Sequence, residues 1–444
     1  MKTLPILLIS TALLSASPNT SVILMIGDGM GPAYTSSYRY YKEVNTSRGI
    51  QKTIFDTLFM GRNSTYSKNS VITDSAAAAT ALATGYKTDN GYVGLRDTTD
   101  LEPQTLLEYA KEKGYVTAMA VTSTLTHATP AAFLSKGHHR KDETGIAKEY
   151  FKKNAKGKLK FDFLIGGGEK YFIEGYADFN VTAKENNVTL YRNGYDLNKV
   201  TSYPFIAFTA NDYPSFAIDE SEENRYRVAK MTQKSLDLMK NKPFFMMIEA
   251  SQIDWCGHIN DVACMMAEME DFSRAITLAK AYVDTNKDTL LLVTADHSTA
   301  GLALGDMIDK KDKNISDEVK SRSYIWYKDI IENVSASSIV IAKDLSTSKE
   351  INATFKKYTD ITLNTKEYKV LSATIASNKE KKLWYAVNDI INNRSNTGWT
   401  SHGHTAVDVE TFAYGKGSEK FRGFMDNTDI AKKIFEVLGR KSKK

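Results

Sequence analysis

The stretch that decides the fold is Val22-Ile23-Leu24-Met25-Ile26-Gly27-Asp28-Gly29, an unbroken apolar run that leads directly into a carboxylate between two glycines. A run this apolar is typical of a strand that is buried on both faces, as strands of a parallel sheet are. The same arrangement recurs along the chain, and each run ends in Gly, Asp, Glu, His or Thr. The further runs are 116–121, 161–165, 244–248 and 290–294.

Helical patterns separate these runs and define the fold class. They span 101–113, 221–240 and 263–280. Strands that alternate with helices predict an α/β fold, with a central, largely parallel sheet flanked by helices. In open sheets of this class, ligands bind beyond the carboxyl ends of the strands. We therefore expect the polar residues that follow the strands to meet in space.

The composition of the 444 residues excludes several classes of protein. A net charge of +5, with 42% hydrophobic and 25% charged residues, is typical of a globular chain and excludes disorder, collagen and coiled coil. Lysine and arginine are spread among acidic residues, so we expect no nucleic-acid readout. A small anionic substrate remains compatible with this charge.

The N-terminus resembles a secretory signal peptide. Met1 and Lys2 precede an apolar stretch, Leu4 to Leu14, which small residues follow. This run is short for a membrane span, and no later segment is long and apolar enough to be one. We predict a signal peptide at 1–17, no membrane span after its removal, and export to the periplasm or the extracellular space. The alternative is a first buried strand.

Residues 305–395 differ from the rest of the chain. They are rich in Lys, Asp, Ser and Asn, show weak periodicity and contain no set of metal ligands. We predict an inserted subdomain mounted on the sheet; the alternative is a continuation of the main sheet.

The two cysteines, Cys256 and Cys264, fall in a stretch that reads as one continuous helix. Eight residues of helix span roughly 12 Å, at about 1.5 Å per residue. That separation is too large for a disulfide, so we predict none.

Ser75 is the candidate nucleophile. It lies in Asp74-Ser75 followed by an alanine-rich run that ends at Gly85, and this pattern predicts a helix with Asp74 or Ser75 as its N-cap. The N–H groups and the positive dipole end at such a start favour a phosphate. The alternative is that Ser75 only caps the helix. Metal ligands elsewhere in the chain favour a serine that a metal ion deprotonates.

Candidate metal ligands are spread over the strand ends. Asp254 and His258 are four residues apart, which places both on one helical face, and Asp296-His297 adds a second carboxylate and imidazole. Hard oxygen donors suited to magnesium come from Thr129 and Glu249. Together with Asp28, these residues predict mixed nitrogen and oxygen ligands for two zinc ions and mostly oxygen ligands for a third ion.

Arg140 is the candidate phosphate-binding residue. It follows two histidines, and a planar guanidinium grips two phosphate oxygens at once. The alternative is a solvated surface arginine. Trp255 lies between two candidate ligands, so it is expected near the metal.

These motifs together resemble the alkaline phosphatase family, in order and over nearly the whole chain, and the resemblance implies a catalytic domain at 18–444 with a three-layer α/β sandwich. The motifs that carry it are Met25-Ile26-Gly27-Asp28-Gly29-Met30-Gly31, residues 73–85, His127-Ala128-Thr129-Pro130, Gly166-Gly167-Gly168, Glu249-Ala250-Ser251-Gln252-Ile253-Asp254, Thr294-Ala295-Asp296-His297 and His404-Thr405.

The resemblance implies a role for each of these residues. It implies hydrolysis of phosphate monoesters through a phosphoserine at Ser75, with Arg140 holding the phosphate. The implied ligands are Asp254, His258 and His404 for the first zinc, Asp28, Asp296 and His297 for the second zinc, and Asp28, Thr129 and Glu249 for magnesium.

The positions of His127 and Trp255 vary within the family, and this combination resembles cold-active marine bacterial members. His402 competes with His404 as a ligand, although the downstream match favours His404. The family usually forms homodimers, so a homodimer is expected. The alternative functions are a phosphodiesterase of the same superfamily and a phosphate-binding protein without turnover.

Overall fold

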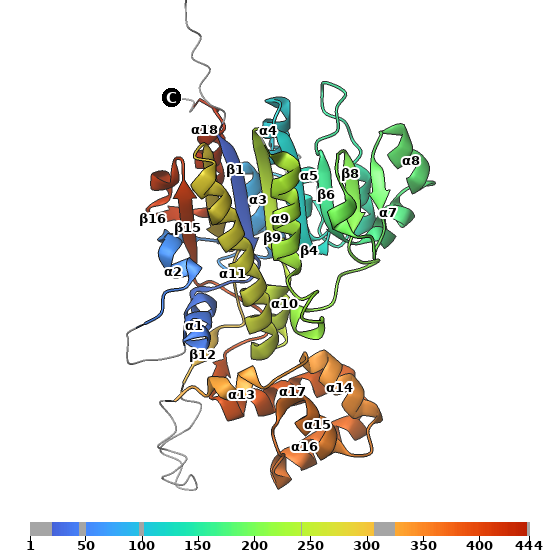
Figure 1. Cartoon of the computed structure of the whole chain (residues 1–444), viewed down its shortest axis with the longest axis vertical. Coiled ribbons are helices and arrows are strands. Elements are labelled where there is room, and N and C mark those ends of the chain that lie inside the picture. The colour runs from blue at the N-terminus through green and yellow to red at the C-terminus, as the bar shows by residue number, and fades with distance from the viewer. Residues whose placement is uncertain (1–19, 44–49, 97–101, 241, 306–324, 442–444) are drawn as a thin grey trace, which may run out of the picture.

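A ten-stranded sheet runs through the main body of the molecule, with helices on both faces (Figure 1). The computed structural model describes residues 20–43, 50–96, 102–240, 242–305 and 325–441, so the expected signal peptide at 1–17 lies outside them. In spatial order the strands are β16 (Gly423–Asp426), β2 (Phe59–Ser64), β15 (Val409–Gly415), β10 (Thr289–Thr294), β1 (Ser21–Gly27), β9 (Phe244–Ala250), β4 (Val116–Thr124), β6 (Phe163–Gly167), β8 (Phe205–Phe208) and β7 (Thr189–Tyr191).

Neighbouring strands of this sheet are parallel, except that β15 runs antiparallel to both β10 and β2. The predicted α/β fold with a largely parallel sheet is therefore confirmed. The apolar pattern did not reveal β2, β15 and β16 toward one edge of the sheet, nor the short strands β7 and β8 at the other edge. Strands β2 and β15 carry polar residues, such as Arg62 and Glu410, that interrupt an apolar run.

The central strand β1 shows why the molecule has three layers. Val22, Leu24 and Ile26 pack into one core, whereas Ile23 and Met25 pack into the other, because side chains alternate along a strand. Helices α1 (Pro32–Lys42), α2 (Ile54–Leu58), α9 (Arg227–Met239) and α11 (Val262–Thr285) cover one face. Helices α3 (Ser75–Thr84), α4 (Leu106–Glu112), α5 (Ala128–Leu134), α6 (Glu143–Glu149), α7 (Glu169–Gly175), α8 (Phe179–Glu185) and α18 (Asn427–Val437) cover the other.

Shorter elements connect these layers. They are β3 (Tyr92–Val93), β5 (His138–His139), η2 (Leu197–Lys199), η3 (Ala217–Asp219), α10 (Gln252–His258), β11 (Ser298–Thr299), β14 (His404–Thr405) and η5 (Ser418–Phe421). Within the described residues, no helix is long and apolar enough to cross a membrane.

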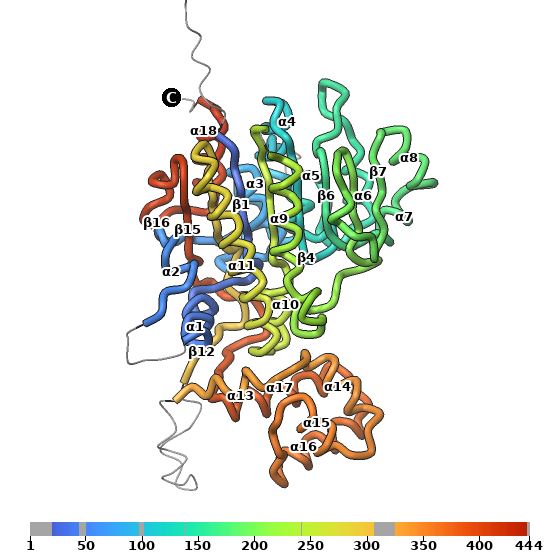
Figure 2. Tube along the Cα trace, in the orientation of Figure 1, coloured from blue at the N-terminus to red at the C-terminus, as the bar shows by residue number. Residues whose placement is uncertain are grey.

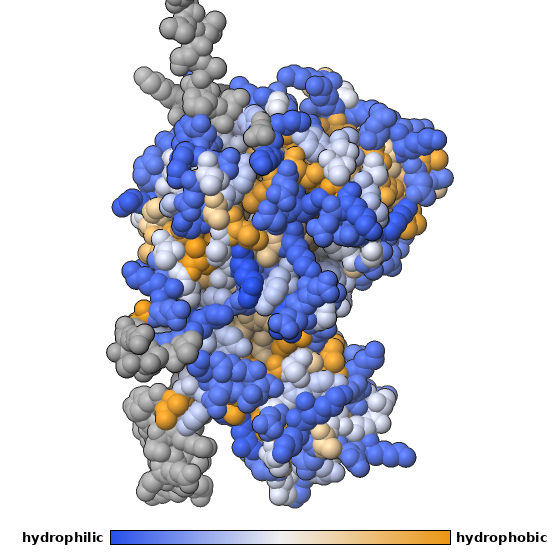
Figure 3. All heavy atoms as spheres, viewed as in Figure 1, coloured by the Kyte–Doolittle hydropathy of each residue, from blue (hydrophilic) through white to orange (hydrophobic). Residues whose placement is uncertain are grey.

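Helices α13 to α17 form a lobe at one end of the molecule, drawn in orange in Figure 2. The lobe is entered and left through an antiparallel pair, β12 (Leu302–Leu304) and β13 (Thr397–Trp399). On the face shown in Figure 3, the surface narrows where the lobe meets the main body. The assignment of 305–395 as an inserted subdomain remains our proposal. The helices are α13 (Lys328–Glu332), α14 (Ser338–Thr347), α15 (Ile351–Thr359), α16 (Thr365–Ala376) and α17 (Glu380–Ser395).

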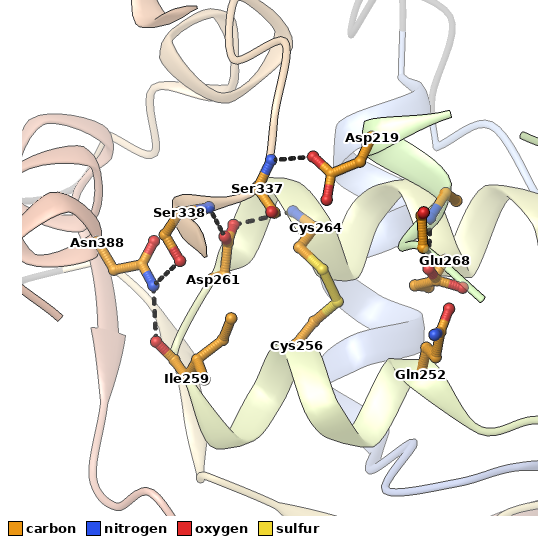
Figure 4. The surroundings of a disulfide bond; sticks show 12 residues. Asp219, Gln252, Cys256, Ile259, Asp261, Cys264, Glu268, Ser337, Ser338 and Asn388 are labelled. Atoms are coloured by element: carbon orange, nitrogen blue, oxygen red, sulfur yellow. Dashed lines mark hydrogen bonds between the residues drawn. A yellow bond between two sulfur atoms is a disulfide. The ribbon is translucent and has the colours of Figure 1, made fainter. Parts of the chain in front are cut away.

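The two cysteines form a disulfide, so the prediction that they lie too far apart is wrong (Figure 4). Cys256 lies in α10, Cys264 lies in α11, and their Cα atoms are 5.6 Å apart. The expected continuous helix is broken between them, because Asn260 adopts a left-handed conformation with φ +56°. Asp261 then caps α11 by accepting a hydrogen bond from the Cys264 N–H at 2.9 Å. The disulfide therefore ties α10 to the long helix α11.

Candidate active site

The carboxyl ends of β1, β9 and β10 lie side by side. Ile26 of β1 is in register with Glu249 of β9 and with Thr294 of β10. Asp28 and Asp296 follow β1 and β10 by one or two residues, and both are completely buried, as is Glu249. The structure thus brings these three carboxylates together at the carboxyl ends of the central strands, as the parallel arrangement predicts.

Ser75 lies at the first position of α3. Asp74 is the N-cap, and its side chain accepts a hydrogen bond from the Ala77 N–H at 3.0 Å. Gly85 ends the helix in a left-handed conformation with φ +79°. The predicted helix is therefore present with the expected boundaries. It presents its N-terminal N–H groups beside the buried Ser75 hydroxyl.

The Ser75 hydroxyl lies against a group of three possible metal ligands. Its Oγ is 3.1 Å from Nε2 of His297. The same nitrogen is 3.4 Å from Oδ1 of Asp28 and 3.3 Å from Oδ2 of Asp296. One cation could contact all three ligand atoms, because each lies within 4.8 Å of the others. This group matches the ligand set expected for the second zinc.

A second group joins α10, β14 and the segment that follows β10. Asp254 Oδ2 is 3.2 Å from Nε2 of His258, and that nitrogen is 3.2 Å from Nε2 of His404. His297 stacks on His404 with ring centroids 3.5 Å apart, so His297 adjoins both groups. His404 rather than His402 lies in this group, whereas His402 offers its carbonyl to Nδ1 of His258 at 2.5 Å. These residues include the set expected for the first zinc.

Three histidines direct Nε2 toward these groups because Nδ1 is engaged elsewhere. Nδ1 of His404 donates to the Thr73 carbonyl at 2.8 Å, and Nδ1 of His258 donates to a carbonyl as described above. Nδ1 of His297 lies 3.2 Å from the Thr299 hydroxyl. Such outer contacts fix the ring orientation of metal-binding histidines.

A third group contains Asp28, His127 and Glu249. Thr129 is buried at the start of α5, and its hydroxyl lies beside the Glu249 carboxylate. The expected magnesium ligands are therefore adjacent. His127 lies closer to them than the sequence pattern indicated, because it occupies the N-cap position of α5.

Several buried oxygen atoms at this site have no hydrogen-bond partner among the described residues. They are both carboxylate oxygens of Asp28, Oδ2 of Asp296 and Oε1 of Glu249. Leaving such atoms unpaired is costly, and buried charges are normally paired or bound to metals. The donor set therefore fits cations.

The same crowding shifts the pKa values of the carboxyl groups. Burial, followed by the charge of Asp296, raises the pKa of Asp28 well above its usual range. Burial also raises the pKa of Asp296 to about 7 and that of Glu249 to about 7. Without cations, these raised pKa values favour the protonated forms of the carboxyl groups near neutral pH.

The pKa values of the histidine side chains shift in both directions. Burial, aided by Arg140, lowers the pKa of His127 to about 3, and burial lowers the pKa of His297 well below its usual range. Burial also lowers the pKa of His258, but its hydrogen bond with Asp254 outweighs this effect and raises the pKa to about 9. Neutral imidazoles at His127 and His297 are the form that binds metal.

Arg140 extends its guanidinium toward the start of α3. One terminal nitrogen lies 3.1 Å from Oδ2 of Asp74, and the other lies 3.3 Å from Nε2 of His127. Because Asp74 also caps α3, it fixes Arg140 relative to Ser75. The structure thus holds the guanidinium near the candidate nucleophile.

The sequence pattern did not predict the roles of two residues at this site, Thr299 and Asp74. The Thr299 hydroxyl donates to Oδ1 of Asp254 at 2.5 Å and lies beside His297, so it links two ligand groups. Asp74 positions Arg140 as well as capping the helix. The only sequence signal for Thr299 is its place two residues after His297. Trp255, as expected, lies near the ligands, packing edge-on against His127 with ring centroids 5.9 Å apart.

We expect the affinity for divalent cations to rise with pH up to about 9. In the metal-free protein, Asp296 and Glu249 (pKa about 7) and His258 (pKa about 9) hold protons below these pH values, and bound cations must displace those protons. One displaced proton raises the apparent affinity about tenfold per pH unit below the pKa of the group that loses it. Competition with a chromogenic chelator between pH 6 and 9 measures this slope, and titration calorimetry in two buffers counts the protons. A pH-independent affinity would contradict these pKa shifts.

Comparisons with known proteins agree with the geometry of the site. The alkaline phosphatase family model matches residues 19–440. Alkaline phosphatase 3 of Bacillus subtilis is 36% identical over 425 residues, which cover 94% of this chain and 88% of that protein. The crystal structure of a cold-active alkaline phosphatase from the psychrophile Shewanella sp. superposes with a TM-score of 0.85 at 36% identity, covering 95% of this chain and 100% of that chain.

A variant of the alkaline phosphatase from the Antarctic bacterium TAB5, solved with magnesium bound, superposes with a TM-score of 0.69 at 25% identity. That match covers 96% of this chain and 99% of the other. The family match extends over nearly the whole sequence, including the sheet and every strand end described above, and the Bacillus relative covers 94% of the chain. The resemblance predicted from the motifs is confirmed: this chain belongs to the alkaline phosphatase family.

Proposed function

We propose that this protein hydrolyses phosphate monoesters to an alcohol and inorganic phosphate through a phosphoserine at Ser75. One observation carries the proposal: the Ser75 hydroxyl lies at the start of α3, 3.1 Å from His297 and beside buried carboxylates, several oxygens of which have no hydrogen-bond partner in the described part of the chain. A nucleophile, a phosphate-binding helix start and cation ligands thus share one site.

Two zinc ions and one magnesium ion fit the donor atoms. Asp254, His258 and His404 would hold the first zinc, Asp28, Asp296 and His297 the second, and Asp28, Thr129 and Glu249 the magnesium. His127 adds a nitrogen donor beside the third group. Bound at these residues, the ions would supply positive charge that lowers the pKa of hydroxyl groups and offsets the charge of the phosphate.

The protein groups then act in a defined order. Arg140 and the N–H groups of α3 bind the phosphate oxygens, which places phosphorus in line with the Ser75 oxygen. The serine oxygen gives up its proton and forms a bond to phosphorus while the ester bond breaks, and the leaving alkoxide takes up a proton and departs as the alcohol. Water then attacks the phosphoserine from the vacated side, releasing phosphate and restoring Ser75. Two inversions give net retention at phosphorus.

The test compares p-nitrophenyl phosphate with bis(p-nitrophenyl) phosphate on the metal-loaded protein. We expect kcat/KM to favour the monoester by about 1,000-fold or more, because Arg140 and α3 are arranged for unesterified oxygens. A preference for the diester would indicate a phosphodiesterase. Release of no more than one phosphate per chain under excess monoester would indicate a phosphate-binding protein.

The homodimer and export belong to the same proposal. Phe59 and Phe424 are 51% and 67% exposed on β2 and β16 at one edge of the sheet, and such apolar side chains favour a contact between copies. The disulfide between Cys256 and Cys264 favours an oxidising compartment, either the periplasm or the extracellular space.

A further inference from the structure

A cleft of about 410 Å³ opens beside His127 and His258, between the main body and the helical lobe. Its walls are mainly aromatic or aliphatic. We propose that this cleft receives the alcohol part of the substrate and selects phosphate monoesters whose alcohol carries a flat aromatic ring. The inference rests on the proposed function and deepens it. The side chains that carry the argument are Glu143, Tyr213, Phe216, Trp255, Ile339 and Trp384.

The wall on the main body is a row of rings that starts at the metal ligands. Trp255 lies one residue after Asp254 and packs edge-on against His127, with ring centroids 5.9 Å apart. Tyr213 packs edge-on against Trp255, with ring centroids 5.0 Å apart. A leaving group that departs beside His258 therefore meets aromatic faces and edges, which another ring contacts favourably.

Hydrogen bonds hold this wall in place. Gln252 of α10 donates from Nε2 to the Pro214 carbonyl at 2.7 Å, directly after Tyr213. Arg227 donates to Oε1 of the same Gln252 at 2.6 Å, and the Ala217 N–H donates to Glu268 at 2.7 Å. The segment that bears Tyr213 and Phe216 is thus fastened to the helix that bears the ligands, so the cleft is formed before substrate binds.

The opposite wall comes from the lobe. Trp384, Asn388 and Asn392 lie four residues apart on α17, so they share one face of the helix. Asn388 donates to the Ile259 carbonyl at 2.7 Å, and Asn392 donates to the Asn260 carbonyl at 2.9 Å. These contacts dock α17 on the turn that follows His258, which brings Trp384 to the cleft.

A second contact docks α14 on the same turn. The Ser338 N–H donates to Oδ2 of the buried Asp261 at 2.7 Å, and the Ser337 N–H donates to Asp219 at 2.7 Å (Figure 4). Ile339 follows directly and lines the cleft. The lobe therefore completes a pocket whose other half belongs to the metal site.

The polar groups of the cleft limit what it accepts. Glu143 is held by the hydroxyls of Thr124 and Thr126 at 2.7 and 2.6 Å, so its carboxylate disfavours an alcohol that carries a further negative charge. The indole N–H of Trp384 has no acceptor among the described residues. A flat, uncharged ring uses the apolar walls without opposing the carboxylate.

The experiment compares benzyl phosphate with ethyl phosphate on the metal-loaded protein, since both are alkyl esters with unactivated leaving groups. We expect kcat/KM to favour benzyl phosphate about tenfold or more. Trp384→Ala and Tyr213→Ala, from opposite walls, should each reduce that ratio about fivefold. Tyr213 is 55% exposed, so its replacement tests the pocket even if Trp384→Ala fails to fold. Tyr368→Ala removes an exposed ring of the lobe and should leave the ratio unchanged.

Competitive inhibition by benzylphosphonate and ethylphosphonate should show the same preference without any chemical step. Equal values for the two esters and the two phosphonates, or a ratio that neither cleft variant changes, would overturn the inference while leaving monoester hydrolysis intact. A preference for choline phosphate over benzyl phosphate would also overturn it, because it would indicate a cation site. Absence of turnover with both esters would instead refute the proposed function.

Discussion

Replacing Ser75 with alanine is expected to lower kcat/KM for p-nitrophenyl phosphate by about 10⁴-fold or more, because the phosphoserine can no longer form. The fold should persist, since alanine suits the first turn of α3 and Asp74 still caps the helix. Steady-state kinetics measures the loss. Acid quenching with radiolabelled substrate should trap a covalent phosphate on the native protein and none on the variant.

The matched control is Ser235→Ala. Ser235 is also completely buried, and its hydroxyl has no partner among the described residues, but it lies on α9 away from the ligands. Its activity should equal that of the native protein. A Ser75→Ala protein with native turnover would refute the assignment of the nucleophile.

Replacing Asp28 with asparagine is expected to have the second largest effect, because Asp28 belongs to two of the three ligand groups. We expect activity to fall more than ~100-fold, beyond the usual loss for a residue that only supports a ligand. Elemental analysis should find at least one metal ion fewer per chain. A full metal complement would refute the role of Asp28 as a shared ligand.

The same variant should be more stable than the native protein when both are metal-free. Burial and the neighbouring Asp296 raise the pKa of Asp28 above its value in the unfolded chain, so folding at neutral pH without a cation requires this carboxyl to take up a proton, which costs free energy. Thermal unfolding in excess chelator should give Asp28→Asn the higher midpoint, and zinc should reverse the order. Asp237→Asn, on the exposed face of α9, should change neither metal content nor midpoint.

Local patterns accounted for much of the fold and of the site. The run Val22 to Ile26 is β1, and the helix predicted between Asp74 and Gly85 is α3. These elements can be predicted from the sequence because a strand buried on both faces requires a continuous apolar run, and helix capping depends on the residues next to the helix end. The prediction for the cysteines was wrong, because a single left-handed residue, Asn260, breaks the helix that the sequence pattern predicts to be continuous.

The order and type of the residues thus determined by themselves the α/β class, the alkaline phosphatase family and the candidate nucleophile and ligands. Only the tertiary structure decided that His297 adjoins two ligand groups, that His127 joins the third, and that Trp384 of the lobe lines the same cleft as His127 and His258. These contacts join residues far apart in the chain, and their geometry depends on how the strand ends, α10 and α17 pack together. No local periodicity encodes that packing.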